Sequence, residues 1–165
     1  MPRNIETTVY TIEEHPNAEK VYEWIRNNWY DLGEYCLQDM IESLESFAEC
    51  IGASVNWALS IHSDRGEYVR FNFGYDEQTL GDVMLNLDLS GNCPFTGMCY
   101  DETILDAFRE VTNDASATLD DVLRNVEHSV LKTLHAEGDY LYSDEGLRDM
   151  CEVNEYEFDE TGAIA

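Results

Sequence analysis

The residues that could catalyse a reaction or bind a metal ion are few and widely spaced. His128 and His135 lie seven residues apart, so on a helix they share a face but stand about 10 Å apart along its axis. That distance is too great for the two side chains to bind one metal ion without further ligands. Cys93 and Cys99 have five residues between them and no second cysteine pair, whereas structural zinc sites use pairs separated by two to four residues. We therefore expect no metal, no cofactor and no catalytic residue, and a protein that is not an enzyme.

Common catalytic motifs are also missing from the sequence. It contains no G-x-S-x-G, H-E-x-x-H, Walker or G-x-G-x-x-G pattern. A hydrolase that uses paired carboxylates or a Cys–His pair stays open as an alternative, because spatial proximity cannot be read from the order of residues. That alternative predicts a pocket in which acidic side chains meet His128 or His135.

Carboxylates are the one reactive group that the chain holds in large excess. It has 35 Asp and Glu against 9 Lys and Arg, a formal charge of -26 over 165 residues. Small soluble domains carry about 2 to 8 net charges, and self-repulsion at a higher level destabilises a compact state. Apolar residues still make up 44% of the chain, enough for a hydrophobic core. This charge repels nucleic acids and anionic membranes, and it favours a basic, nucleic-acid-binding protein as the partner.

Some of the acids recur at helical spacing, which suggests what they could bind. Asp39, Glu42, Glu45 and Glu49 follow one another at intervals of three or four residues, or about 4.5 to 6 Å on a helix. One strand of duplex DNA carries a charge every 3.4 Å or so, a comparable line of negative charge. We therefore predict that the chain imitates DNA toward a basic partner. The predicted partner-binding acids are Asp39, Glu42, Glu45, Glu49, Asp101, Glu102, Asp106, Asp120, Asp121, Glu137, Asp139, Asp144, Glu145 and Asp149.

This hypothesis has an open alternative and a further requirement. The acids could instead be ordinary solvated helix faces that serve solubility, and this alternative stays open. Charge alone does not select one basic groove over another, so exposed aromatic residues would have to supply specificity. Tyr140, Tyr142 and Tyr156 lie among acids and are the candidates, with packing of a C-terminal helix as the alternative.

Apolar periodicity predicts the elements that hold these acids. Helices are expected over 17–29, 35–53, 101–111 and 118–137, with a short helix after Ser143, and strands over 5–12, 55–61, 68–73, 83–89 and 155–158. Asp101 is expected to cap its helix, and Thr118 with Asp121 resembles a capping box. The prediction is an α+β fold in a single domain, 1–165: a small antiparallel sheet of about three to four strands, packed by about five helices with their acidic faces outward.

Two segments carry a resemblance to a known group of proteins. One is C-x-x-T-G-x-C-x-D-E at Cys93–Glu102, and the other is Y-S-D-E…C-E-x-N-x-Y-E-F-D-E-x-G at Tyr142–Gly162. Together with the order of elements, they resemble a group of small acidic proteins encoded by tailed phages and prophages. Such proteins are often labelled as antitoxin components. The resemblance covers most of the chain and is weakest near its start, at 11–20. It implies expression in a bacterial cytoplasm.

The charge and the resemblance together predict a counter-defence protein. The first hypothesis is an inhibitor of a host DNA-targeting complex, either an RNA-guided Cas complex or a restriction enzyme, that blocks a basic DNA channel. The alternative is an antitoxin that masks a basic toxin. No segment is apolar enough to span a membrane, and the first residues lack the apolar stretch of a secretion signal. We therefore expect the protein in the bacterial host cytoplasm.

Overall fold

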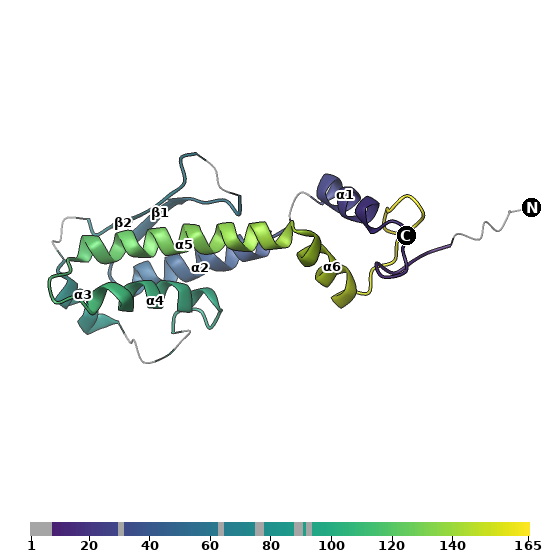
Figure 1. Ribbon diagram of the computed structural model, residues 1–165. Coiled ribbons are helices and arrows are strands. Elements are labelled where there is room, and N and C mark those ends of the chain that lie inside the picture. Colours follow the sequence, from purple (N-terminus) through teal and green to yellow (C-terminus); the bar gives the residue numbers. More distant parts are fainter. Residues whose placement is uncertain (1–7, 30–31, 63–64, 75–77, 88–90, 92–93) are drawn as a thin grey trace, which may run out of the picture. The chain divides into compact units, whose positions relative to one another are not determined.

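The chain groups into two compact units in a computed structural model that describes residues 8–29, 32–62, 65–74, 78–87, 91 and 94–165. The first unit combines both ends of the chain, Met1–Leu32 and Asp139–Ala165, and the second is Gly33–Gly138. Each unit has a hydrophobic core of its own. Figure 1 shows the elements in both units. The expectation of a single domain over 1–165 stays a prediction.

The second unit holds most of the secondary structure. Its helices are α2 (Glu34–Cys50), α3 (Leu80–Asn86), α4 (Tyr100–Thr112) and α5 (Leu119–Leu141), the last of which continues into the first unit. Its strands are β1 (Ser54–Ala58) and β2 (Tyr68–Asn72), which pair antiparallel. The predicted helices over 35–53, 101–111 and 118–137 are confirmed, and so is the hairpin. The Thr118–Asp121 capping box is also present, because each backbone N–H donates to the other residue's side chain.

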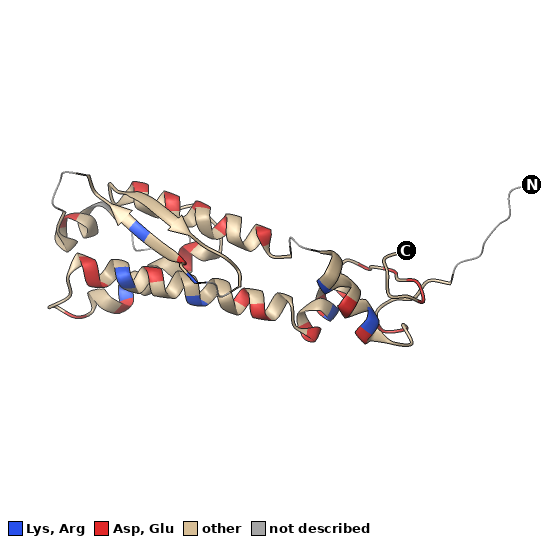
Figure 2. Cartoon of the chain, turned by 90° about the horizontal axis from the view of Figure 1, so that it is seen from above, with Lys and Arg blue, Asp and Glu red and all other residues tan. Residues whose placement is uncertain are grey.

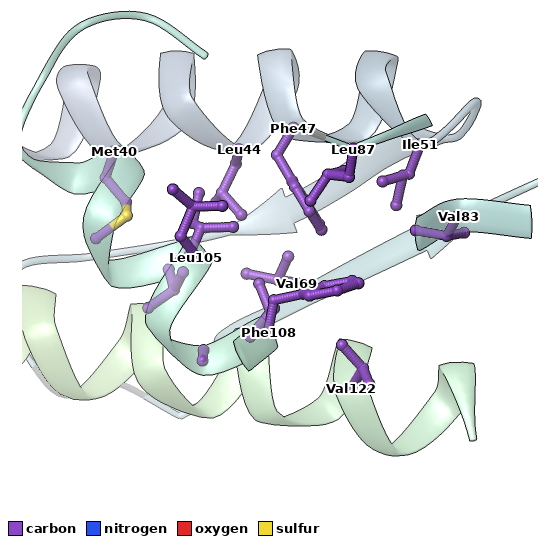
Figure 3. Packing of buried hydrophobic residues seen from close by; sticks show 14 of the residues in the cluster. Met40, Leu44, Phe47, Ile51, Val69, Val83, Leu87, Leu105, Phe108 and Val122 are labelled. Carbon is purple, nitrogen blue, oxygen red and sulfur yellow. The ribbon is translucent and has the colours of Figure 1, made fainter. Parts of the chain in front are cut away.

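Phe47 lies at the centre of the core of the second unit. Its ring meets those of Phe71 and Phe95 edge to face at 5.5 Å and that of Phe108 at 6.2 Å. Met40, Leu44 and Phe47 of α2, and Ile51 just after its end, follow one another at steps of three and four, so all four side chains point to the core (Figure 3). The apolar face of α2 is thereby buried, and its acidic face is left to solvent.

The hairpin covers this core with one of its faces. Val55 pairs with Phe71 and Trp57 with Val69, and these four side chains lie on one face because strand side chains alternate. Val69 is buried on that face. The opposite face carries Asn56 and Arg70, which are exposed.

The strand predicted over 83–89 is wrong for the residues that the structure describes. Residues 80–86 form α3, which starts at a capping box: Thr79 Oγ1 accepts from Asp82 N, and the Asp82 carboxylate accepts from Thr79 N. Alternation of apolar residues also places Val83 and Leu87 four apart, on one face of a helix, where both are buried. Leu85 points the other way and is 87% exposed. Residues 88 and 89 lie outside the described part of the chain.

The predicted fold class is therefore wrong as well. The described residues form six helices and one two-stranded sheet, where about five helices and three to four strands were expected. The strands predicted at the two ends are reduced to isolated bridges, Tyr10 with Phe158 and Phe158 with Ile164. Residues 5–7 of the first predicted strand lie outside the described residues. Each end contributes only one or two paired residues, which are too few to form a strand.

The first unit is built from the two ends of the chain. Its helices are α1 (Ala18–Asn28) and α6 (Asp144–Val153), and α6 begins at Ser143, whose side chain accepts from Gly146 N as predicted. Val21, Ile25, Leu147 and Phe158 are fully buried in its core. Tyr10 and Phe158 exchange two backbone hydrogen bonds of 2.9 and 2.8 Å, which tie the N-terminal segment to the C-terminal one.

Candidate interaction surface

The solvent side of α2 carries a continuous row of carboxylates. Glu42, Glu45 and Glu49 are all exposed, and Asp39 is half-buried. Their spacing of three and four residues is the same as that of the apolar residues, but it falls on the opposite side of the helix. Figure 2 shows red at successive turns of α2 and no blue. We call Glu42, Glu45 and Glu49 the α2 row.

No base among the described residues neutralises the α2 row. The helix contains no Lys or Arg, and none of the three carboxylates forms a salt bridge within the described part of the chain. Glu42 Oε1 accepts one neutral hydrogen bond, from Gln38 Nε2 at 3.1 Å. Glu49 lies in the last turn, where the helix dipole already presents partial negative charge. The row therefore costs α2 some stability, and a purely structural role does not explain it.

Tyr35 belongs to the same face and was missed from the sequence. It is 62% exposed and lies seven residues before Glu42, two turns along the helix. A hydrogen bond with Cys36, partial burial and the negative charge of Glu137 and Asp39 raise the pKa of Tyr35 to about 12. The phenol therefore keeps its proton at neutral pH. The available signal was its heptad spacing from Glu42, outside the apolar positions of the helix.

Asp101 was predicted to lie on the partner-binding surface, but it is buried. Its side chain is 0% exposed, so it cannot contact a partner. One oxygen accepts from Ser43 Oγ at 2.7 Å and Thr96 Oγ1 at 2.8 Å, and the other accepts from the backbone N–H groups of Phe95, Thr96 and Gly97. Asp101 thus orders the loop before α4 and does not cap the helix, for which Cys99 is the N-cap residue.

The hydrogen bonds of Asp101 also decide its protonation state. Burial alone would raise the pKa of this carboxyl, but the bonds from Ser43, Thr96 and Phe95 outweigh burial and hold the pKa below its usual range. The buried group is therefore a carboxylate at neutral pH. It is fully satisfied, which explains how a charge persists in the core of the second unit.

The other predicted acids of the second unit are partly engaged by neighbours. Asp106 lies 3.2 Å from Arg109, and Asp120 lies 2.6 Å from Arg124. Asp121 is held by the capping box, in which hydrogen bonds from Thr118 lower the pKa of its carboxyl. Glu102 is exposed and forms no salt bridge with another described residue, and Glu137 is half-buried. These acids contribute less free charge than the α2 row.

Four predicted acids belong to the first unit. Asp144 pairs with Arg26, and Asp149 accepts a hydrogen bond from the hydroxyl of Tyr140. Asp139 and Glu145 are exposed. The predicted surface is therefore divided between the two units, and α2 carries its densest described part.

The aromatic candidates of the first unit differ in exposure. Tyr140 is exposed, whereas Tyr142 and Tyr156 are half-buried against the core of the first unit. Tyr156 also packs edge to face on Trp29. Tyr140 is thus the most exposed of the three, and its hydroxyl donates to Asp149.

The hydrolase alternative requires a pocket in which acidic side chains meet His128 or His135, whereas the structure shows His135 in a contact between two segments and His128 exposed. His135 Nε2 donates to Glu67 Oε2 at 2.9 Å, and Glu67 Oε1 accepts from Ser60 N at 3.1 Å. This contact joins α5 to the segment between the two strands. His128 is exposed. No group of three or more His, Cys, Asp or Glu among the described residues is arranged to hold a metal ion, and Cys93 lies outside that part of the chain.

Comparison with family models, curated proteins and solved structures finds no match. The resemblance to phage-encoded acidic proteins stays a prediction. Within the described residues, no helix has both the length and the apolar character needed to cross a membrane.

Proposed function

We propose that the chain is a phage-encoded inhibitor of a host DNA-targeting defence complex. It acts in the bacterial cytoplasm by occupying a basic channel that would otherwise hold DNA. The target is an RNA-guided Cas complex or a restriction enzyme. The observation that supports this proposal is the α2 row, three exposed carboxylates on a helix that contains no base.

The spacing of the α2 row suits a surface that binds phosphates. Carboxylates at intervals of three and four residues recur about every 4.5 to 6 Å along the helix axis. Lys and Arg side chains are long and flexible enough to meet charges at this spacing as well as phosphates at theirs. Binding releases the ions held by the basic channel, so the affinity falls as salt rises. Tyr35 and Tyr140 supply exposed aromatic surface for specificity.

The test is capture of the target followed by competition with DNA. Immobilised protein is incubated with bacterial lysate at low salt and at about 0.5 M salt, where exposed charges are screened within a few ångströms. Retained proteins are identified by mass spectrometry. The purified target is then titrated with a labelled DNA duplex in the presence of the protein. We expect a Cas or restriction complex that is retained at low salt, and DNA that is displaced.

Two triple variants with the same change of charge separate position from net charge. The first is Glu42→Gln, Glu45→Gln and Glu49→Gln. The matched control is Glu13→Gln, Glu23→Gln and Glu160→Gln, three exposed acids outside the predicted surface. We expect the first variant to lose at least tenfold in affinity and the control to lose much less. Equal losses would mean that net charge alone drives binding, and the α2 row would lose its role.

The antitoxin alternative has a distinct outcome in the same experiment. It predicts one small basic toxin bound in a fixed ratio, retained in place of a DNA-targeting complex. The resemblance stated for Cys93–Glu102 and Tyr142–Gly162 favours testing it alongside. If no basic protein is retained at either salt concentration, the acids serve solubility and the proposal fails.

A further inference from the structure

The two outer edges of the hairpin are chemically different. Val69 N donates to Glu127 Oε1 at 3.1 Å, so the N–H of Val69 points away from β1 and toward α5. Opposed residues in an antiparallel pair alternate between exchanging hydrogen bonds and pointing their backbone groups outward. Trp57 is the residue opposite Val69, so its N–H and C=O point outward from β1. Val55 lies two residues before Trp57 on the same strand, so its N–H and C=O also point outward.

The edge of β1 is open in the part of the chain that the structure describes. No described residue forms a hydrogen bond with the outward backbone groups of Val55 or Trp57. Proteins usually protect such edges with Lys, Pro, a bulge or a covering segment. The sequence of β1, SVNWA, has no charge and no proline, and Trp57 is 37% exposed. By contrast, Glu127 occupies an outward N–H of β2.

Charge distinguishes the possible occupants of this edge. A second copy would bring another -26 charges against the first, so self-pairing is opposed by repulsion. The edge of β2 adjoins a hollow lined by two bases, Arg70 and Arg124, and two acids, Asp120 and Glu127, so it offers no net charge to attract a basic segment. The edge of β1 is on the side of α2, as Figure 2 shows, and α2 holds the acidic row.

We propose that β1 pairs with an extended, Lys- and Arg-rich segment of the partner protein. The partner adds a strand outside β1, and its backbone bonds to Val55 and Trp57. Alternate side chains of an added strand point to the helix side of the sheet, where basic groups reach the carboxylates of α2. This inference rests on the proposed function for the basic character of the partner. It adds the mode of binding and a register, neither of which the acids alone provide.

The experiment uses two peptides of equal charge and the full chain labelled with nitrogen-15. The probe is Ac-KTKVKTK-NH2, which can form a strand. The control is Ac-KPPKKPK-NH2, in which prolines at odd and even positions interrupt the row of N–H donors on both edges. Affinity is measured by calorimetry at low salt, and exchange of each backbone amide proton by NMR with and without peptide.

We expect the probe to bind at least tenfold more tightly than the control. It should also slow exchange at Val55 and Trp57, while Asn56, whose N–H bonds to β2, changes little. Equal binding of both peptides with unchanged exchange at Val55 and Trp57 would overturn the β1 inference, and so would no binding of either peptide. Slow exchange at these two residues that depends on protein concentration, without peptide, would identify a second copy as the occupant and also overturn it.

The triple Gln variant of the α2 row separates this inference from the proposed function. We expect that variant to weaken both peptides, because the charge attraction is shared, while the preference for the probe over the control is kept. A preserved preference with no loss of affinity would support strand addition at β1 and count against the role of the α2 row. Loss of affinity for both peptides without any preference would do the reverse.

Discussion

Asp101 shows how a residue of the right type can lie in the wrong place for a surface. We predict that Asp101→Asn lowers the free energy of unfolding by about 2 to 4 kcal/mol, because an amide NH2 would face N–H donors in a buried site. Those donors belong to Phe95, Thr96 and Gly97. Denaturation by urea measures the loss. Asp106→Asn, on the exposed side of the same helix, is the control and should change stability by no more than about 0.5 kcal/mol.

The same carboxyl predicts a dependence of stability on pH. Its pKa in the folded protein lies below the usual value, so its contribution is fully present above the unfolded value of about 3.9. The contribution is lost as the pH falls through the folded pKa. We expect the difference in stability between wild type and Asp101→Asn to be constant from pH 5 to 7 and to shrink below pH 4. A difference in stability that grows on acidification would show that the pKa of Asp101 is raised and not lowered.

Local residue patterns explain which site residues could be predicted from sequence. The positions of Glu42, Glu45 and Glu49 follow from a single helix with one apolar face, so their exposure was predictable. The burial of Asp101 depends on Ser43, which is 58 residues away in the sequence, and no local pattern reports that contact. Tyr35 was within reach of the same helical spacing but was not among the candidate aromatics.

At the scale of elements, α2 trades stability for exposed charge. Its acids repel one another at spacings of three and four residues, and Glu49 opposes the helix dipole. We predict that removing each repulsion raises the free energy of unfolding by a few tenths of a kcal/mol at low salt. The triple Gln variant of the α2 row should therefore melt at a higher temperature than wild type. Circular dichroism measures the shift, and about 0.5 M salt should reduce it. A lower melting temperature would contradict the trade-off.

Helix α5 packs against the backbone at one glycine. A Cβ on Gly138 would lie 1.9 Å from the carbonyl oxygen of Ile61, although alanine is normally the better helix former by about 1 kcal/mol. We therefore predict that Gly138→Ala destabilises the second unit by about 1 to 3 kcal/mol, the usual cost of overpacking. Urea denaturation provides the measurement.

Gly81 offers a matched control for this substitution. It lies within α3, and the nearest atom to an added Cβ is Thr79 Oγ1 at 3.7 Å, an ordinary contact. Gly81→Ala should leave stability unchanged or raise it by up to about 1 kcal/mol. If Gly138→Ala were equally well tolerated, the close approach of α5 to Ile61 would be wrong.

The elements themselves were predictable to the extent that one periodicity dominated. Long helices such as α2 and α5 have many apolar residues at steps of three and four, and both were found. The segment Val83–Leu87 satisfies alternation and helical spacing together, and the Thr79–Asp82 capping box decides for the helix. That pair was visible in the sequence, so it is the signal that the prediction of a third strand overlooked.

At the scale of the whole molecule, salt should act in opposite directions on stability and on binding. Screening relieves the self-repulsion of 35 acids, so the melting temperature should rise between about 0.02 and 0.5 M sodium chloride. The complex with a basic partner should weaken over the same range. Calorimetric melting and binding titrations give the two slopes. Slopes of the same sign would mean that specific ion binding, and not screening, controls one of them.

The first unit has a consequence for synthesis, because its core joins residues near both ends of the chain. Tyr10 pairs with Phe158, and Val21 and Ile25 share a core with Leu147. Asp139–Ala165, which completes this core, is synthesised after all of Gly33–Gly138, so the core of the first unit forms only once that later segment has emerged from the ribosome. Until then, the apolar side of α1 has no partner from the C-terminal segment. Translation that stops after Gly138 would therefore leave an exposed apolar helix, which chaperones and proteases recognise.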